Sequence, residues 1–501
     1  MSSTKAAAAA PKSNGRTVAI ITMFFMFAMI SFVTNMAAPF GNIWSFKYEW
    51  AGMAGNLMNF TAYLFMGIPA GNMLIKYGYK KTALIALAVG AIGLGIQLLS
   101  SVVGGNVVVI GGENPTYLNL FIYLLGALVC GFCVCMLNTV VNPMLNLLGG
   151  GGNKGNQLIQ TGGTLNSLSG TLTPLLVGIL VGTLTKQTTM AAVAPLVITG
   201  IAIFVLSFIV ISFVKIPEPQ QNLSKVKYER SPLAFRHCTL GIIAIFFYVG
   251  IEIGIPGEMN AWISRESFAG AAAVAGSLAA LYWLMMLIGR FLSSIISGKV
   301  STRAQMVTVS SVAIILIMLA IFIPKTYTFD VPNIVYDPVD KTASMLKAVN
   351  VPDETIEAFI QTPDEEIIAA YAEPIMNEYE IEPATVVKQI TTTPSVPIST
   401  IFLFLCGLCT SVMWGGIFNL ATEGLGKYTA KASGLFMMMV VGGGVMPYIQ
   451  DMIARSGMGY VNSYWLVIAM LAYILFYSLI GSKNVNKDIP VSEEPFDARN
   501  L

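Results

Sequence analysis

Twelve long apolar stretches constrain this chain more than any other feature of its sequence. A helix of about 20 apolar residues crosses the ~30 Å hydrocarbon layer of a bilayer, and every stretch is long enough to do so. Only 11% of the residues are charged, whereas a soluble domain has about a quarter. The composition therefore excludes a soluble enzyme and predicts an all-α polytopic membrane protein with twelve transmembrane helices. The stretches lie near residues 17–38, 52–75, 82–104, 117–148, 160–183, 190–214, 239–263, 272–297, 303–323, 398–421, 431–454 and 459–481.

The lysines and arginines predict the orientation of these helices. Nineteen of the 28 lie in the leader 1–16, the tail 482–501 and the connections on the same side of the membrane as these two segments. Eight lie on the other side, and Arg290 lies within an apolar stretch. Because cationic loops are retained in the cytoplasm, both termini are expected to be cytoplasmic. The first stretch is longer than the core of a signal peptide, so we expect it to remain as the first helix.

Two long connections divide the chain. The basic segment 215–238 separates residues 17–214 from residues 239–481, with six predicted helices in each part, which is the division of a two-lobed transporter. Residues 324–397 form a predicted extracytoplasmic insert with 13 acidic residues and 4 lysines. Within it, residues 353–360 and 364–377 predict short capped helices. The insert is read as a solvated cap, with a substrate-gating lid as the alternative.

The cysteines and the single histidine offer little chemistry. Cys406 and Cys409 form a C-x-x-C pair, but they lie in an apolar stretch without a nearby histidine. They are therefore read as small packing residues. His237 is predicted at a membrane edge. We expect no catalytic residue, no metal and no cofactor, and the net charge of +2 gives no reason to expect a nucleic-acid partner.

Neutral amides are the first group of candidate site residues. Asn138, Asn142 and Asn146 are spaced at i, i+4 and i+8, which places them as one stripe on a helix. Gln160 and Asn166 lie in the first half of the next stretch. Amides both donate and accept hydrogen bonds, so they suit a polyhydroxylated ligand better than an ionic one. The alternative is that they bond one helix to another.

Three charged residues are predicted inside the membrane, and all lie in the second half of the chain: Glu252, Glu258 and Arg290. Such residues are costly in hydrocarbon and usually mark function. Pro256 is expected to kink the helix between the two glutamates. Two interpretations stay open, namely a static ion pair of Glu252 with Arg290 and a protonation or ligand role for the carboxylates.

Aromatic and glycine residues complete the candidate site. Trp414, with Asn260 and Asn419, offers a flat face and hydrogen-bonding groups for a sugar ring. A glycine and proline pattern occurs in both 162–174 and 434–447, which predicts corresponding close-packed helices in two related halves.

These residues lie in stretches that resemble the major facilitator superfamily and, within it, the fucose/proton symporter family that includes glucose/galactose permeases. The loop motif between the second and third helices is degenerate, with Lys76 where other branches carry an acidic and basic pair. The resemblance covers nearly the whole chain except the leader, the insert and the tail. The matching stretches are LNTVVNPMLNLLG (137–149), QTGGTLNSLSG (160–170), FFYVGIEIGIPGEMNAWI (246–263), YWLMMLIGRFLSSIISGKV (282–300) and MWGGIFNLATEGLGKYTAKASGLFMMMVVGGGVMP (413–447).

The resemblance implies a sugar site between two six-helix lobes. It offers Asn142, Gln160 and Asn166 from the first lobe and Asn260, Trp414 and Asn419 from the second as contacts. Asn35 and Asn138 stand where the fucose symporter has proton-coupling carboxylates, so both are treated as substrate-binding candidates. The coupling candidates are therefore Glu252 and Glu258.

The resulting prediction is a monomeric secondary active transporter in the bacterial inner membrane. It would import a neutral hexose with a proton by alternating access. A passive sugar facilitator and a sodium-coupled transporter remain alternatives with the same fold. A membrane sugar sensor that does not transport is the alternative from another class.

Overall fold

The computed structural model describes the predicted spans almost completely. The leader to residue 12, most of the linker (217 and 219–229) and the tail from residue 492 lie outside the described residues, as do residues 181–183 of the fifth predicted stretch. The described residues are 13–48, 51, 54–112, 115–180, 189–216, 218, 230–265, 271–379, 382–486 and 488–491. Within them, ten helical segments are long and apolar enough to cross a membrane.

Five helical elements lie in the described residues of the first lobe. One of them, α2, consists of two helices joined at a kink, where Gly78 has φ of 81°, and these two helices cover the second and the third predicted stretch. Two short antiparallel strands, β1 (Val108–Ile110) and β2 (Thr116–Tyr117), connect α2 to the next helix. The helices are α1 (Ser13–Lys47), α2 (Ala54–Leu99), α3 (Leu118–Leu148), α4 (Gly152–Leu180) and α5 (Ala194–Phe213).

The second lobe begins after the linker, and its eleventh predicted stretch is divided. A 3₁₀ turn at the glycine-rich segment separates α15 from α16. Helix α6 continues through Pro256 as one helix. The elements are η3 (Pro232–Ala234), α6 (Arg236–Ile263), α7 (Ala271–Ile296), α8 (Thr302–Phe322), α14 (Ser399–Thr422), η4 (Gly426–Tyr428), α15 (Thr429–Met438), η5 (Met439–Val441), α16 (Gly442–Ile453), η6 (Ala454–Met458), α17 (Tyr460–Phe476) and η7 (Tyr477–Gly481).

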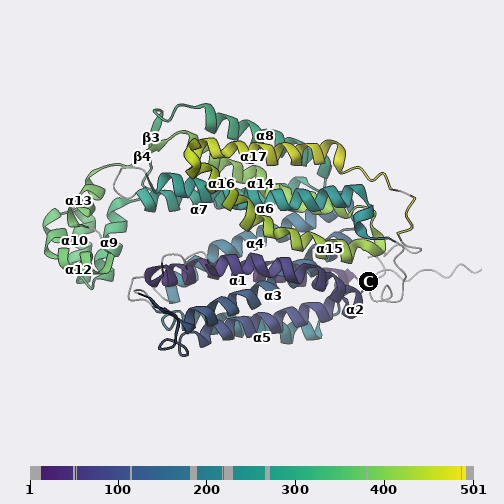
Figure 1. Ribbon diagram of the computed structural model, residues 1–501, viewed down its shortest axis with the longest axis horizontal. Coiled ribbons are helices and arrows are strands. Elements are labelled where there is room, and N and C mark those ends of the chain that lie inside the picture. Colours follow the sequence, from purple (N-terminus) through teal and green to yellow (C-terminus); the bar gives the residue numbers. More distant parts are fainter. Residues whose placement is uncertain are drawn as a thin grey trace, which may run out of the picture.

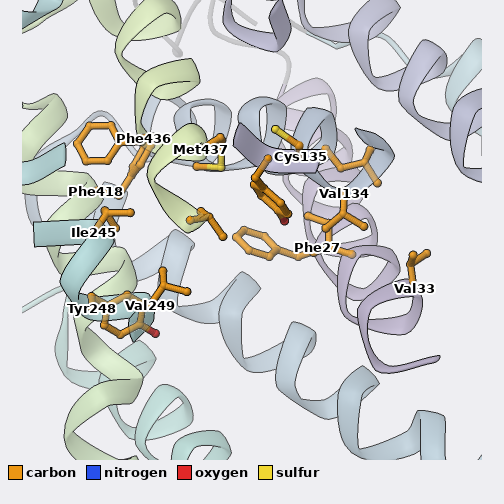
Figure 2. Packing of buried hydrophobic residues seen from close by; sticks show 14 of the residues in the cluster. Phe27, Val33, Val134, Cys135, Ile245, Tyr248, Val249, Phe418, Phe436 and Met437 are labelled. Atoms are coloured by element: carbon orange, nitrogen blue, oxygen red, sulfur yellow. The ribbon is translucent and has the colours of Figure 1, made fainter. Parts of the chain in front are cut away.

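These helices form the two-lobed bundle that the apolar stretches predict (Figure 1). Figure 2 shows apolar side chains of both lobes packed in the interior, with Phe27 from α1, Val134 and Cys135 from α3, Val249 from α6 and Met437 from α15. Large apolar side chains also cover the outer faces, where Phe213 is 83% exposed. A surface of this kind is suited to lipid rather than water.

The insert has its own small core and projects from one end of the bundle (Figure 1). An antiparallel pair of strands, β3 (Thr328–Asp330) and β4 (Ser395–Pro397), closes its base. The predicted helix at 353–360 is confirmed as α10, but the predicted helix at 364–377 is divided at Tyr371. The helices are α9 (Pro338–Ala348), α10 (Asp353–Gln361), α11 (Glu365–Ala370), α12 (Ala372–Tyr379) and α13 (Pro383–Thr391).

The bundle has two distinct ends. The linker end carries the start of α1, the end of α14 and residues 482–491, where the main chain of Arg236 donates to the side chain of Asn486. The insert end carries the carboxyl-terminal ends of α6 and α8.

The lobes touch at the linker end and diverge towards the insert end. A Cβ atom added to Gly434 of α15 would lie 2.5 Å from the carbonyl oxygen of Gly67 in α2, so the two backbones are in direct contact. The same addition at Gly444 of α16 would meet nothing closer than 3.9 Å. An apolar groove opens there, lined by residues that include Leu57 and Tyr448.

Candidate functional site

Two of the predicted amides join the lobes at the middle of the interface. Asn142 of α3 accepts a hydrogen bond from Trp414 Nε1 of α14 at 3.0 Å. Gln160 of α4 donates to the carbonyl of Val412, also in α14, at 2.9 Å. Asn142 and Gln160 are fully or almost fully buried, at 0% and 2% exposure. Both side chains are therefore withheld from water, and each forms one hydrogen bond with the opposite lobe.

A partly buried ion pair lies beside these amides, with the side chains of Arg290 and Glu252 13% and 14% exposed. Arg290 Nη2 of α7 is 3.2 Å from Glu252 Oε1 of α6, so the pairing left open by the sequence is present. Arg290 Nη1 also reaches α4 of the other lobe, where it donates to Ser167 Oγ at 2.7 Å and to Asn166 Oδ1 at 3.4 Å. The pair has no net charge, which makes it tolerable in a membrane interior, but loss of either partner would leave a buried charge.

Asn166 ties this ion pair to the first helix. Its side-chain amide donates to the carbonyl of Phe27 in α1 at 2.8 Å while its oxygen accepts from Arg290. Helices α1, α4, α6 and α7 are thereby linked through one amide and one guanidinium group. We call Asn142, Gln160, Asn166, Glu252, Arg290 and Trp414 the central cluster.

Two aromatic residues border the central cluster. Tyr248 of α6 packs against Trp414, with 6.2 Å between ring centroids and 55° between ring planes. Tyr282 of α7 shares a 2.9 Å hydrogen bond with Thr410 of α14. Tyr248 was not among the predicted site residues. Its position four residues before Glu252, on the same helical face, is the signal that would have identified it.

Asn419 lies apart from the central cluster, nearer the linker end. Its side-chain amide donates across the lobe interface to Asn146 Oδ1 and to the carbonyl of Gly152, both at 3.0 Å. Its oxygen accepts from Thr302 at 3.2 Å, and Asn146 also donates to Thr422 at 3.3 Å. We call Asn146, Thr302, Asn419 and Thr422 the linker-end clamp, because they hold the lobes together at that end.

Three further predicted residues have local partners. Asn35 donates to the carbonyl of Ser31 at 2.8 Å within α1. Asn138 donates to Tyr63 Oη of α2 at 2.9 Å, within the first lobe. Asn260 accepts from Ser264 at 3.3 Å near the insert end of α6. None of these hydrogen bonds crosses between the lobes.

Glu258 is separate from the central cluster as well. It lies six residues beyond Glu252 on α6 and is only 4% exposed. Its Oε2 atom has no hydrogen-bond partner among the residues that the structure describes. A buried carboxylate oxygen without a partner is costly, so this residue needs a separate explanation.

The cysteines and the histidine occupy packing positions. All six cysteines are buried and free. The Nε2 atom of His237 lies 3.0 Å from the carbonyl oxygen of Glu423, at the linker end of the second lobe. In the described part of the chain, no group of three or more His, Cys, Asp or Glu residues is placed to hold a metal ion.

Comparison with known proteins agrees with this architecture. The sequence profile of the Major Facilitator Superfamily matches residues 18–336. A glucose/galactose transporter of Brucella abortus is 25% identical over 484 residues, covering 94% of this chain and 96% of that protein. A putative glucose/galactose transporter of Helicobacter pylori is 24% identical over 479 residues, covering 93% and 96% respectively.

Solved structures show the same fold. A crystal structure of the E. coli fucose:proton symporter superposes with a TM-score of 0.66 at 16% identity, covering 93% of this chain and 100% of that one. A structure of a proton:xylose symporter bound to a bromodeoxyglucose gives a TM-score of 0.58 at 10% identity, covering 94% and 98%. At these identities the likeness establishes the fold alone.

Proposed function

Because the chain belongs to the major facilitator superfamily, we propose that it imports a neutral hexose together with a proton by alternating access. The observation that carries this proposal is the pairing of Asn142 with Trp414 across the lobe interface. The Brucella abortus relative, which is named a glucose/galactose transporter, supports the substrate class. The chain is thus assigned to transport rather than to catalysis.

The central cluster is the proposed sugar site. Amide groups can exchange their hydrogen bonds to the opposite lobe for bonds to sugar hydroxyls with little loss of hydrogen-bond energy, because they both donate and accept. The indole of Trp414 supplies a flat apolar face for the ring. Asn142, Gln160 and Asn166 would contact the sugar from one lobe and Trp414 from the other.

The remaining amides are proposed to border this site. Asn35 and Asn138 lie on the first-lobe side of it, on α1 and α3. Asn260 lies towards the insert end and Asn419 towards the linker end. We propose that the sugar passes Asn260 on entry and Asn419 on release.

The arrangement of the lobes supports an outward-facing state. The cationic residues on the linker side of the chain favour a cytoplasmic linker end. The linker-end clamp joins the lobes there, while α2 and α16 diverge at the other end. A bundle closed to the cytoplasm and splayed outward is one of the two states that alternating access requires.

Coupling is proposed to use the glutamates of α6. Glu252 pairs with Arg290, which in turn contacts Ser167 of the opposite lobe. Protonation of Glu252 would remove half of that ion pair and free Arg290 to change partners as the lobes rock. Glu258 is the second carboxylate available. A passive facilitator remains the second candidate, because Asn35 and Asn138 stand where the fucose/proton symporter that this chain resembles has carboxylates.

Counterflow of labelled hexoses tests the substrate site without requiring a gradient. Proteoliposomes loaded with unlabelled sugar are expected to take up labelled glucose or galactose. Asn142→Ala should raise the KM for the exchanged sugar because one amide is lost from the site. Asn462→Ala is the matched control, because the exposed side chain of Asn462 donates to the carbonyl of Met458, four residues earlier. Absence of hexose exchange in the wild type would contradict the proposal.

A further inference from the structure

Two buried oxygen atoms on neighbouring helices of the second lobe lack partners. Glu258 Oε2 of α6 and Gln450 Oε1 of α16 have no hydrogen-bond donor among the described residues, although the two side chains are 4% and 0% exposed. Each such acceptor costs free energy when it is withheld from water. A hydrogen-bond donor between Glu258 Oε2 and Gln450 Oε1 would satisfy these acceptors.

The Gln450 oxygen lies against the face of α6 to which Glu258 also belongs. A Cβ atom added to Gly254 would lie 2.7 Å from Gln450 Oε1, so the amide of Gln450 is seated directly on Gly254. Glu258 follows Gly254 by four residues, which places it one helical turn further along that face. The other end of the Gln450 amide is held, since Nε2 donates to Ser463 of α17 at 3.3 Å.

The charged and titratable groups around Glu258 lie closer to the insert end. They are Arg265, just after α6, Asp451 of α16 and Arg455 of η6, while Tyr464 faces it from α17. Asp451 and Arg455 are already paired with each other at 2.8 Å. Tyr464 donates its hydroxyl to the carbonyl of Ile255. Asp451, Arg455 and Tyr464 are thus engaged elsewhere, and Glu258 Oε2 has no donor among the described residues.

We propose that Glu258 is the outward-facing proton-binding site of this transporter and that Gln450 holds its protonated form. A proton from the outer solution binds Glu258 Oε2, and the resulting O–H group donates to Gln450 Oε1. One proton thereby satisfies both acceptors and removes the charge from the interior. The inference rests on the proposed proton symport, and it names the residue that carries the proton.

The position of Pro256 explains how binding here can influence transport. Glu258 lies two residues beyond Pro256, where α6 lacks one backbone hydrogen bond and bends more easily. When Glu258 is neutral, the outer turn of α6 packs against α16 and α17. When it is ionised, its carboxylate is attracted to Arg265 and Arg455 and leaves Gln450. The proton is released once α6 leaves this packing in the inward-facing state.

Infrared difference spectroscopy of the purified protein tests the site independently of transport. Between about pH 8 and about pH 6, ordinary exposed carboxyl groups stay ionised. The wild type should show a carboxylic-acid C=O band that grows across this range and is absent in Glu258→Gln. Glu354→Gln, which removes an exposed carboxylate of the insert, should retain the band. Gln450→Met should move the midpoint of the band to lower pH, because the protonated form loses its acceptor.

Transport measurements separate this inference from the proposed function. With an inward proton gradient, Glu258→Gln should lower the accumulation ratio of labelled hexose to one but retain counterflow. Accumulation by Glu258→Gln equal to that of the wild type, or an unchanged band in that variant, would overturn the inference while leaving symport intact. A wild type that shows the band but never accumulates sugar would instead refute the proposed symport. If Glu258→Gln fails to fold, the shift in Gln450→Met decides the question.

Discussion

Asn419→Ala tests the assignment of the linker-end clamp. The side chain makes two hydrogen bonds to the opposite lobe, to Asn146 and to the carbonyl of Gly152. Each is worth about 0.5–1.5 kcal/mol net, so their loss should weaken the closed linker end by about 1–3 kcal/mol. Since about 1.4 kcal/mol corresponds to a tenfold change in an equilibrium constant, the ratio of outward-facing to inward-facing molecules should fall by roughly 5- to 150-fold.

Spin labels at the insert end measure this ratio. Leu57 of α2 and Tyr448 of α16 are 54% and 66% exposed, and both line the apolar groove between these helices. With spin labels on Leu57→Cys and Tyr448→Cys, pulsed electron paramagnetic resonance measures the distance between the two labels. Adding Asn419→Ala should enlarge the population with short distances, in which the insert end is closed. Asn462→Ala is the control, because its exposed side chain donates to the carbonyl of Met458 in its own lobe. An unchanged distance distribution in Asn419→Ala would refute the clamp.

Three further predictions concern stability and the insert. Gly71→Leu should lower the Tm of the purified protein, because a Cβ atom there would lie 2.8 Å from the carbonyl oxygen of Ala430. Gly95→Leu should not lower it, since a Cβ atom added at Gly95 would meet no neighbouring atom within 4 Å. Equal Tm values for the two variants would contradict the Gly71 contact. Burial raises the pKa of Glu218, although the carboxylate accepts from the backbone N–H groups of Tyr79 and Lys80. A raised pKa means that the protonated carboxyl favours the folded state, and this stabilisation is lost as pH rises through the raised pKa. Glu218→Gln, which stays neutral, should therefore raise the Tm relative to the wild type at about pH 7 but not at about pH 4; the opposite order would refute this reasoning. Replacement of residues 338–391, the helices α9 to α13, by a short glycine–serine linker should leave hexose counterflow intact, because these helices pack around a core of their own; loss of exchange in a folded protein would assign the insert a role in transport.

The transmembrane architecture was predictable because it depends on local hydropathy. Each apolar stretch could be recognised without knowing its neighbours, and the two-lobed fold followed. The elements of the insert that were missed are short helices with few residues to form a pattern, or strands that pair across a long stretch of sequence. Helices α9 and α13 of the insert are only 11 and 9 residues long, and each begins with a proline at its first position. The pairing of β3 with β4 joins segments on either side of the insert, which no local pattern reveals.

The sequence could nominate candidate site residues but not how they lie relative to one another. Asn142 and Trp414 were both singled out, yet their hydrogen bond joins positions 272 residues apart. Trp414 and Asn419 share one helix, but they face different parts of the lobe interface, and only the register of α14 against α3 and α4 decides this. The choice between an ion pair and a free carboxylate at Glu252 likewise required the position of Arg290.

Uptake of labelled hexose into proteoliposomes with and without an inward proton gradient tests the central claim most directly. Coupled transport predicts accumulation above equilibrium only when the gradient is present, and a collapse to equilibrium when a protonophore is added. Equal uptake under both conditions, with no accumulation in either, would contradict proton symport. The same vesicles with an imposed sodium gradient would then distinguish a passive facilitator from a sodium-coupled transporter.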